Sequence, residues 1–303
     1  IAASDPAGAG GAAGAGVTQM AFSTSAGFPV VDFEPLAAAR TFVLDPGDGA
    51  RSVFIKVKDA AGNVSGVVSR SITVDTAPPS AGSVVIDGGA STTNSGSLAL
   101  ALSAQGATHM RISTDGVFDS EPTVNFSTSA TATVSGNGAH SVFVLYLDDA
   151  GNESAVATSS IVLDTSAPTS PSIAFVTSTA GFIASTTATV TIAGTNATKM
   201  KLQTVETTNS CGADPAINLA SAPLIPFATT ATVTLTANQA AANTPPGAAN
   251  RCKYAQLQLF DDAGNASAAV QAKIELDDQA PDAPRIATSS QTVDASSVGV
   301  ALA

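Results

Sequence analysis

The sequence predicts an all-β protein, arranged as a linear array of small two-sheet β-sandwiches. Three observations support this fold class: a motif that recurs three times, short strand-like runs separated by Gly, Asn, Asp and Pro, and the lack of any helical hydrophobic period. The composition agrees, because aromatic residues make up only 5% of the chain and small or β-branched residues are abundant. Such side chains suit thin sandwiches with short strands.

The repeats are defined by three markers that occur in the same order. An Asp-x-Ala-Gly-Asn-x-Ser block stands at 59–65, 148–154 and 261–267. A Val/Leu-Asp block ending in Pro follows it at 74–79, 163–168 and 276–281. The only methionines, Met20, Met110 and Met200, fall at matching places, and successive turn blocks are 89 and 113 residues apart. This order indicates tandem repeats.

The segments between the markers are expected to be strands. In the second repeat they are Ser83–Asp87, Ser97–Ser103, Thr108–Ser113, Val124–Ser127, Thr131–Ser135, Ser141–Leu147 and Ser159–Leu163. The Gly-Asn pair supplies a turn with positive φ between the last two strands. The proline after each linker Asp ends a strand and stiffens the connection. The methionines are expected to fill the cores, and seven short strands per repeat predict a sandwich.

The two blocks together resemble the bacterial immunoglobulin-like repeats of large secreted adhesins and surface proteins. The run from Phe33 to Ile55 also matches the middle of such repeats, and the resemblance extends from about Val17 to Pro281. It implies tandem immunoglobulin-like sandwiches and an extracellular or cell-surface location. It says little about function, because one fold serves many functions.

The markers predict five segments. A Gly/Ala-rich segment covers 1–16, an immunoglobulin-like domain lacking its first two strands covers 17–78, and complete domains cover 79–167 and 168–280. The segment 281–303 matches the first two strands of a further domain. The spacing of the second repeat would place a missing strand of the first near residues 7–13, where Ala and Gly make a poor strand.

The extra strands after Pro281 match the strands that the first domain lacks. We therefore expect subunits to join head to tail, with 284–303 of one copy adding to the first domain of the next. Such contacts build filaments unless the rotation closes a ring. The alternative is that the sequence is a window of a longer repeat array. The expected donor interface consists of Ile286, Val298, Val300 and Leu302.

The third repeat carries an insertion of 24 residues, divided between about 205–222 and 238–251. It contains both cysteines, Cys211 and Cys252, which are expected to form a disulfide in an oxidising, extracellular setting. The alternative is two buried free thiols. A stapled insertion on a rigid sandwich is a candidate binding tip, and the alternative is a decoration without a function.

A second expected contact surface lies on the strand that precedes the turn in the second repeat. Strand alternation places Phe143, Leu145 and Leu147 on the outer face of the sheet. An outward apolar stripe indicates a contact surface. The alternative is that a neighbouring loop covers it.

Calcium is the only metal that the sequence suggests. Acidic residues recur before each turn and before each linker proline: Asp59, Asp75, Asp148, Asp164, Asp261 and Asp277. The related adhesin repeats often hold calcium at domain junctions, and calcium takes six to eight oxygen ligands. The alternative is that each Asp caps a turn through backbone N–H groups.

Several functions are not expected. A net charge of −12 disfavours nucleic acid as a partner, and no apolar stretch is long enough to insert into a membrane. The two histidines, His109 and His140, have no nucleophile motif nearby, so we do not expect an enzyme.

The sequence therefore predicts a structural subunit of an extracellular filament, sheath or adhesin stalk, with other copies of itself as partners. The alternative is an adhesive or glycan-binding repeat region of a large secreted surface protein, which would bind host or surface glycans.

Overall fold

The computed structural model describes residues 3–6, 14–177, 181–206, 213–237 and 252–277. Within these residues the regular structure is almost entirely β, with one short 3₁₀ helix at Asp87–Gly89, so the all-β prediction is confirmed. The chain divides into two compact units. One comprises Ile1–Ser91, Gly96–Ser135 and Ala139–Ile161, and the other Thr92–Ser95, Gly136–Gly138 and Val162–Ala303. The predicted boundaries of the five segments stay predictions.

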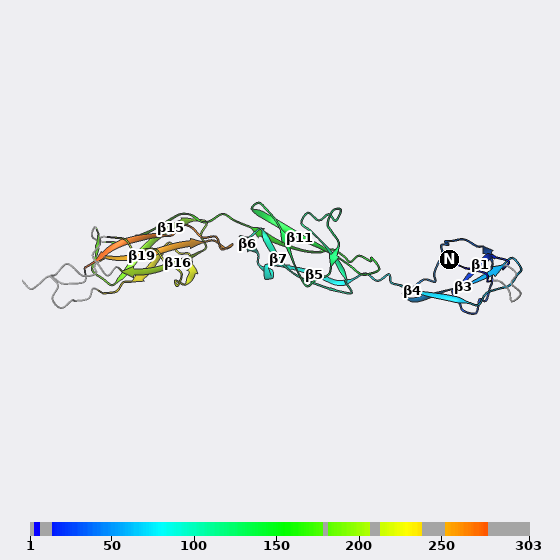
Figure 1. Ribbon diagram of the computed structural model, residues 1–303. Helices are drawn as coiled ribbons and strands as arrows, with labels where there is room; N and C mark the ends of the chain where they lie inside the picture. Colours follow the sequence, from blue (N-terminus) through cyan, green and yellow to red (C-terminus); the bar gives the residue numbers. More distant parts are fainter. Residues whose placement is uncertain (1–2, 7–13, 178–180, 207–212, 238–251, 278–303) are drawn as a thin grey trace, which may run out of the picture. The chain divides into compact units, whose positions relative to one another are not determined.

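The second repeat folds into a sandwich of two sheets (Figure 1). One sheet has the order β10-β7-β5, with strands Ser129–Thr133, Ser97–Gln105 and Ser80–Ile86. The other has the order β6-β12-β11-β8-β9, with strands Thr92–Thr93, Ala157–Leu163, Gly138–Leu147, His109–Ser113 and Val124–Asn125. Each of the seven expected strands overlaps one of these. The three-plus-five arrangement is that of an immunoglobulin-like sandwich.

The third repeat has the same arrangement. Its smaller sheet has the order β13-β15-β18, with strands Thr169–Phe175, Thr187–Thr195 and Thr230–Thr234. Its larger sheet has the order β14-β20-β19-β16-β17, with strands Phe182–Ile183, Val270–Leu276, Cys252–Phe260, Lys199–Glu206 and Leu224–Pro226. The 24-residue insertion therefore leaves the order of the strands unchanged.

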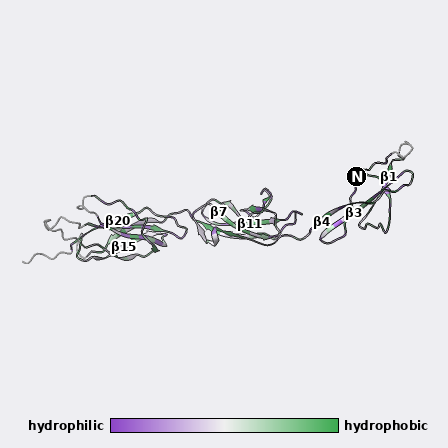
Figure 2. Ribbon diagram, turned by 60° about the horizontal axis from the view of Figure 1, so that its bottom comes forward, coloured by the Kyte–Doolittle hydropathy of each residue, from purple (hydrophilic) through white to green (hydrophobic). Residues whose placement is uncertain are grey.

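Alternating apolar residues form the core between the two sheets of each sandwich. In β7, Leu98, Leu100 and Leu102 are buried while their neighbours are exposed. Val144 and Tyr146 of β11 are fully buried, and Figure 2 shows hydrophobic residues along the strands. The Tyr146 hydroxyl donates to the Ser83 carbonyl of the other sheet. Burial raises the pKa of Tyr146 to about 12, so the hydroxyl keeps its proton.

All three marker methionines are buried. Met110 and Met200, 3% and 1% exposed, lie in the cores of the two sandwiches, where the prediction that methionines fill the cores is confirmed, and Met20 is 1% exposed in the first repeat. Each stands on the strand that pairs with the long strand before the turn: β1 with β3, β8 with β11, and β16 with β19. The thioether fills the space that a Trp occupies in many immunoglobulin domains.

The first repeat differs from the other two. Its described residues form one sheet with the order β2-β1-β3-β4, made of Glu34–Pro35, Val17–Ser23, Gly49–Asp59 and Val68–Val74 (Figure 1). This sheet corresponds to the larger sheet of the complete sandwiches. No second sheet opposes it among the residues that the structure describes.

Candidate functional site

The candidate interface is the side of the first-repeat sheet that would face a core, here called the inner face. It consists of Val53, Ile55 and Val57 of β3 and Val68, Ile72 and Val74 of β4. Val68 and Ile72 are 61% and 58% exposed, whereas their counterparts in β12, Ala157 and Ile161, are 9% and 2% exposed. Among the described residues no second sheet opposes these side chains, although Met20 in the same sheet is 1% exposed.

A segment of the first repeat that should form a strand does not do so. Residues 40–44 align with β10 of the second repeat, which pairs with β7. The structure assigns no strand to 40–44, although Phe42 lies against Phe22 of β1 with 5.7 Å between the ring centres. A strand needs a partner for its backbone groups, and no counterpart of β7 is present among the described residues.

The Asp-x-Ala-Gly-Asn block forms a closed turn between the last two strands. Asn152 donates from its backbone nitrogen to Asp148 Oδ1 at 2.9 Å and from Nδ2 to Asp148 Oδ2 at 2.8 Å. Gly151 has a φ of +88°, which explains the invariant glycine of the three copies. The hydrogen bonds from Asn152, led by its side chain, lower the pKa of Asp148, and Asn63 lowers the pKa of Asp59 in the same way.

The Asn of this turn also binds the linker that precedes its own sandwich. Asn152 Nδ2 donates to the Asp75 carbonyl oxygen at 3.0 Å, and Asn265 Nδ2 donates to the Asp164 carbonyl oxygen at 2.7 Å. Each bond lies within one compact unit. We call this contact the linker latch. Sequence analysis grouped the linker aspartates with those of the turns, but it missed the role of Asn and of the backbone carbonyl.

The aspartates proposed for calcium accept hydrogen bonds in this structure, and calcium binding stays a prediction. The carboxylate of Asp148 is taken up by Asn152, and the carboxylate of Asp75 accepts the backbone N–H of Ala77 in its own linker. An amide N–H, which is a donor, stands where calcium would need an oxygen. No group of three or more potential metal-binding side chains occurs in the described part of the chain. The turn-capping alternative accounts for these contacts.

The structure corrects the prediction that an apolar stripe of the second repeat faces outward. Leu145 and Leu147 are only 6% and 7% exposed, and Phe143 is half-buried. The loop between β8 and β9 packs over Phe143, since a Cβ on Gly116 would lie 3.3 Å from its ring. The prediction of an exposed apolar surface there is therefore wrong, because the outer face of the sheet has a loop on it.

In the other two repeats, the segment that corresponds to the loop between β8 and β9 also covers the outer face of its sheet. In the first, Lys56 lies over the Phe28 ring and Lys58 over the Phe33 ring, each 4.6 Å from the ring centre. In the third, Gln256 is fully buried, and its amide donates to the Ala216 carbonyl in the insertion. Sequence analysis treated each strand alone and so did not predict that these loops pack on the outer faces of the sheets.

The described part of the insertion lies against its sheet. Leu219 and Ala222 are buried. Lys253, 1% exposed, forms an ion pair of 2.7 Å with Glu206. This part does not form the protruding tip that was considered from the sequence, because its side chains are used in packing.

The predicted disulfide and the predicted donor residues fall mostly outside the described residues. Cys252 is 1% exposed and disulfide-bonded, but its expected partner Cys211 lies outside the described residues, so the pairing stays a prediction. The donor residues Ile286, Val298, Val300 and Leu302 also lie outside them.

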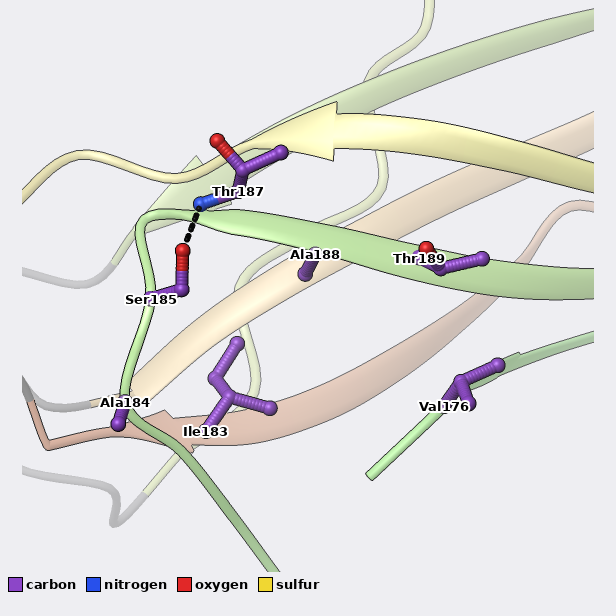
Figure 3. Close-up of a pocket in the computed structure, with 7 residues that line it drawn as sticks. All are labelled: Val176, Ile183, Ala184, Ser185, Thr187, Ala188 and Thr189. Atoms are coloured by element: carbon purple, nitrogen blue, oxygen red, sulfur yellow. Dashed lines mark hydrogen bonds between the residues drawn. The ribbon is translucent and has the colours of Figure 1, made fainter. Parts of the chain in front are cut away.

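An open pocket of about 460 Å³ lies at one end of the third sandwich (Figure 3). Its lining residues are Val176, Ile183, Ala184, Ser185, Thr187, Ala188 and Thr189. Ser185 Oγ accepts the Thr187 N–H at 3.1 Å. None of the lining residues is an acid or a base, so the pocket has no group for proton transfer.

No protein-family model matches the chain, and no curated protein matches it. No helix among the described residues is long and apolar enough to span a membrane.

The similar solved structures are arrays of β-sandwiches. Fibronectin(III)-like modules of Clostridium thermocellum CbhA share 12% identity over 64% of this chain and 93% of theirs, with a TM-score of 0.37. The central fibronectin-III array of RIM-binding protein shares 14% over 84% of each chain, with a TM-score of 0.24. The BSP domain of a biofilm associated protein shares 13% over 77% and 43%, with a TM-score of 0.19. Similarity this low assigns neither a family nor an activity.

Proposed function

We propose that this chain is a structural, non-enzymatic repeat unit of an extracellular filament, sheath or adhesin stalk, and that it polymerises by strand donation. In this proposal, residues 284–303 of one copy cover the inner face of the first repeat of the next. The observation that carries the proposal is the exposed inner face, where Ile72 is 58% exposed and Ile161, its counterpart, is 2% exposed. An uncovered apolar face of this kind favours association.

The donor segment has the apolar pattern that the inner face requires. The run Pro284-Arg-Ile286-Ala aligns with Pro171-Ser-Ile173-Ala at the start of β13. Val298, Val300 and Leu302 align with the buried Ala188, Val190 and Ile192 of β15. A donor with this pattern would supply both strands that the complete sandwiches place opposite the larger sheet.

One position links the donor to the first repeat in particular. In the second sandwich, a Cβ on Gly82 would lie 2.9 Å from the Tyr146 ring, so this aromatic requires glycine opposite it. The residue of the donor that aligns with Gly82 is Pro284, and the residue of the first repeat that aligns with Tyr146 is Val57. The smaller Val57 leaves room for a proline ring where Tyr146 does not.

Donation would also complete the segment 40–44. In the second sandwich, Ser129 of β10 pairs with Ala101 of β7. Their counterparts are Ala39 in the first repeat and Ala301 in the donor segment. A donated strand would therefore pair with 40–44 as β7 pairs with β10 in the second sandwich. It would also close an open sheet edge.

Cysteine crosslinking between copies tests the proposal. Ala39→Cys is placed in one chain and Ala301→Cys in another, and the two are mixed under mild oxidation at a concentration where the wild-type chain forms filaments. Directly opposed residues of antiparallel strands have Cβ atoms about 5 Å apart. We therefore expect a covalent dimer that forms only in the mixture.

Two controls define the register. Ala101→Cys with Ser129→Cys in one chain reproduces the same pair inside the second sandwich, where the strands are already joined. Gly299→Cys in place of Ala301→Cys shifts the donor by two residues and should crosslink less. A wild-type chain without filaments, or filaments without the Ala39–Ala301 crosslink, contradicts strand donation.

The remaining alternative is an adhesive or glycan-binding repeat region of a larger surface protein. It predicts a chain that stays monomeric and binds a saturable ligand. A glycan array probed with the monomer distinguishes this alternative from the filament proposal.

A further inference from the structure

The linker latch occurs twice within the described residues and is left incomplete twice. Asn152 and Asn265 each bind the carbonyl oxygen of the preceding linker Asp. Among the described residues, no carbonyl accepts from Asn63 in this way, and no group donates to the carbonyl oxygen of Asp277. One turn and one linker of the same kind are therefore without their counterpart among the described residues.

The turn of the first repeat has the same internal hydrogen bonds as the two that bind a linker. Asn63 donates from its backbone nitrogen to Asp59 Oδ1 at 2.7 Å and from Nδ2 to Asp59 Oδ2 at 2.8 Å. These distances match those of Asn152 and Asn265. An amide nitrogen carries two N–H groups, so Asn63 keeps one that Asn152 uses for the linker. The amide is held in place before any linker arrives.

The linker that begins at Asp277 starts with the same backbone hydrogen bond as the bound linker that begins at Asp164. The Asp277 backbone nitrogen donates to the Ile183 carbonyl at 2.8 Å, and the Asp164 nitrogen donates to the Thr93 carbonyl at 2.9 Å. Each Asp follows the last residue of a strand, Leu276 or Leu163, that is itself buried. The backbone nitrogens of Asp277 and Asp164 are therefore held in the same way.

We propose that Asn63 of one copy binds the carbonyl oxygen of Asp277 of a second copy, which forms a linker latch between subunits. The inference rests on the proposed strand donation. The linker Asp precedes the first strand of its sandwich by five residues in both complete repeats, Asp75 before Ser80 and Asp164 before Thr169. A donor strand that takes the place of β5 would bring its own linker Asp to the turn by the same path.

The latch adds a polar, directional contact to an otherwise apolar interface. Apolar strands with a period of two slip in register by two residues at little cost in contacts, because each slip returns apolar residues to the same face. A hydrogen bond at the start of the donated segment fixes which of its residues pairs first with the acceptor sheet. Asn63 is thus inferred to set the register of subunit joining.

The test compares matched variants of the full chain by their critical concentration for assembly, measured by sedimentation. Asn63→Ala should raise the critical concentration about fivefold, which is the factor expected for the loss of one hydrogen bond of ordinary strength. Asn152→Ala loses the same bonds inside one chain and should lower the melting temperature without changing the critical concentration. Melting of Asn63→Ala below the critical concentration checks that the first repeat stays folded.

A second measurement applies if Asn63→Ala unfolds the first repeat. Asn63→Cys in one chain and Asp277→Cys in another should then crosslink in the mixture and not in either chain alone. Failure of this crosslink overturns the latch.

The two proposals fail in different ways. If positions 39 and 301 crosslink between copies but Asn63→Ala assembles like the wild type, the latch is wrong and strand donation stands. If the wild type does not assemble, or positions 39 and 301 do not crosslink, strand donation is wrong and the latch falls with it.

Discussion

The first repeat and the second sandwich have the same turn, the same marker methionine and the same strand sequence pattern, yet they differ in burial. Val142, Val144 and Tyr146 of β11 are fully buried, whereas the aligned residues of β3 are only half-buried. In the second sandwich a three-stranded sheet lies opposite, and among the described residues of the first repeat none does.

This difference shows which parts of the fold are locally determined. Four strands of the first repeat pair in the order of the larger sheet without an opposing layer, because hairpins and a turn hold them together. The segment 40–44 does not form its strand, because that strand belongs to the other sheet. The larger sheet thus forms from its own contacts, and the smaller sheet forms only as a unit.

The largest effect is expected from a matched pair of truncations at one aligned position. Ile161→Ala should destabilise the second sandwich by about 3 kcal/mol, because it leaves a cavity in a closed core. Ile72→Ala should cost the monomer less than about 1 kcal/mol, because its side chain is already largely in water. Urea melts of both monomers measure the effects, and equal losses would contradict an open inner face.

An exchange of side chains sharpens the comparison between Val57 and Tyr146. Val57→Tyr should weaken assembly about 10- to 100-fold, because overpacking costs roughly 1–3 kcal/mol and the ring meets Pro284 of the donor. Pro284→Gly should restore assembly with this variant, as Gly82 accommodates Tyr146. Critical concentrations of the single and double variants provide the measurement, and a double variant no better than Val57→Tyr would contradict the pairing.

A smaller effect is expected on acidification, and it should be shared by both regions. The pKa of Asp59 and of Asp148 is lowered, so the charged form stabilises the fold. This stability is present above the ordinary value of 3.8 and is lost as the pH falls through the lower pKa of the folded state. Asp148→Asn should reduce the loss of melting temperature between about pH 5 and about pH 2. A variant with the wild-type slope would contradict the turn-capping role.

No effect is expected from a chelator. The amide N–H of Asn152 joins Asp148 to the linker without a cation, so EDTA should leave the melting temperature unchanged. A fall on chelation that calcium reverses would instead support the calcium prediction at these aspartates.

Sequence reasoning was strongest where the signal is local. The strands of the second repeat, the turns and the core methionines follow from alternation, glycine positions and spacing. It was weakest for contacts between segments that are distant along the chain. The cover over Phe143 depends on a loop whose path alternation does not describe, and the linker latch joins Asp75 to Asn152 across most of a repeat.

The sequence by itself determined the all-β class, the repeat and the turn chemistry, because each depends on neighbouring residues. The tertiary structure alone decided which apolar residues are covered. Ile72 and Ile161 occupy the same place in the same motif, and only the presence of an opposing sheet distinguishes a surface residue from a core residue. Burial is a property of the whole assembly of strands, and pattern within one strand does not reveal its partner.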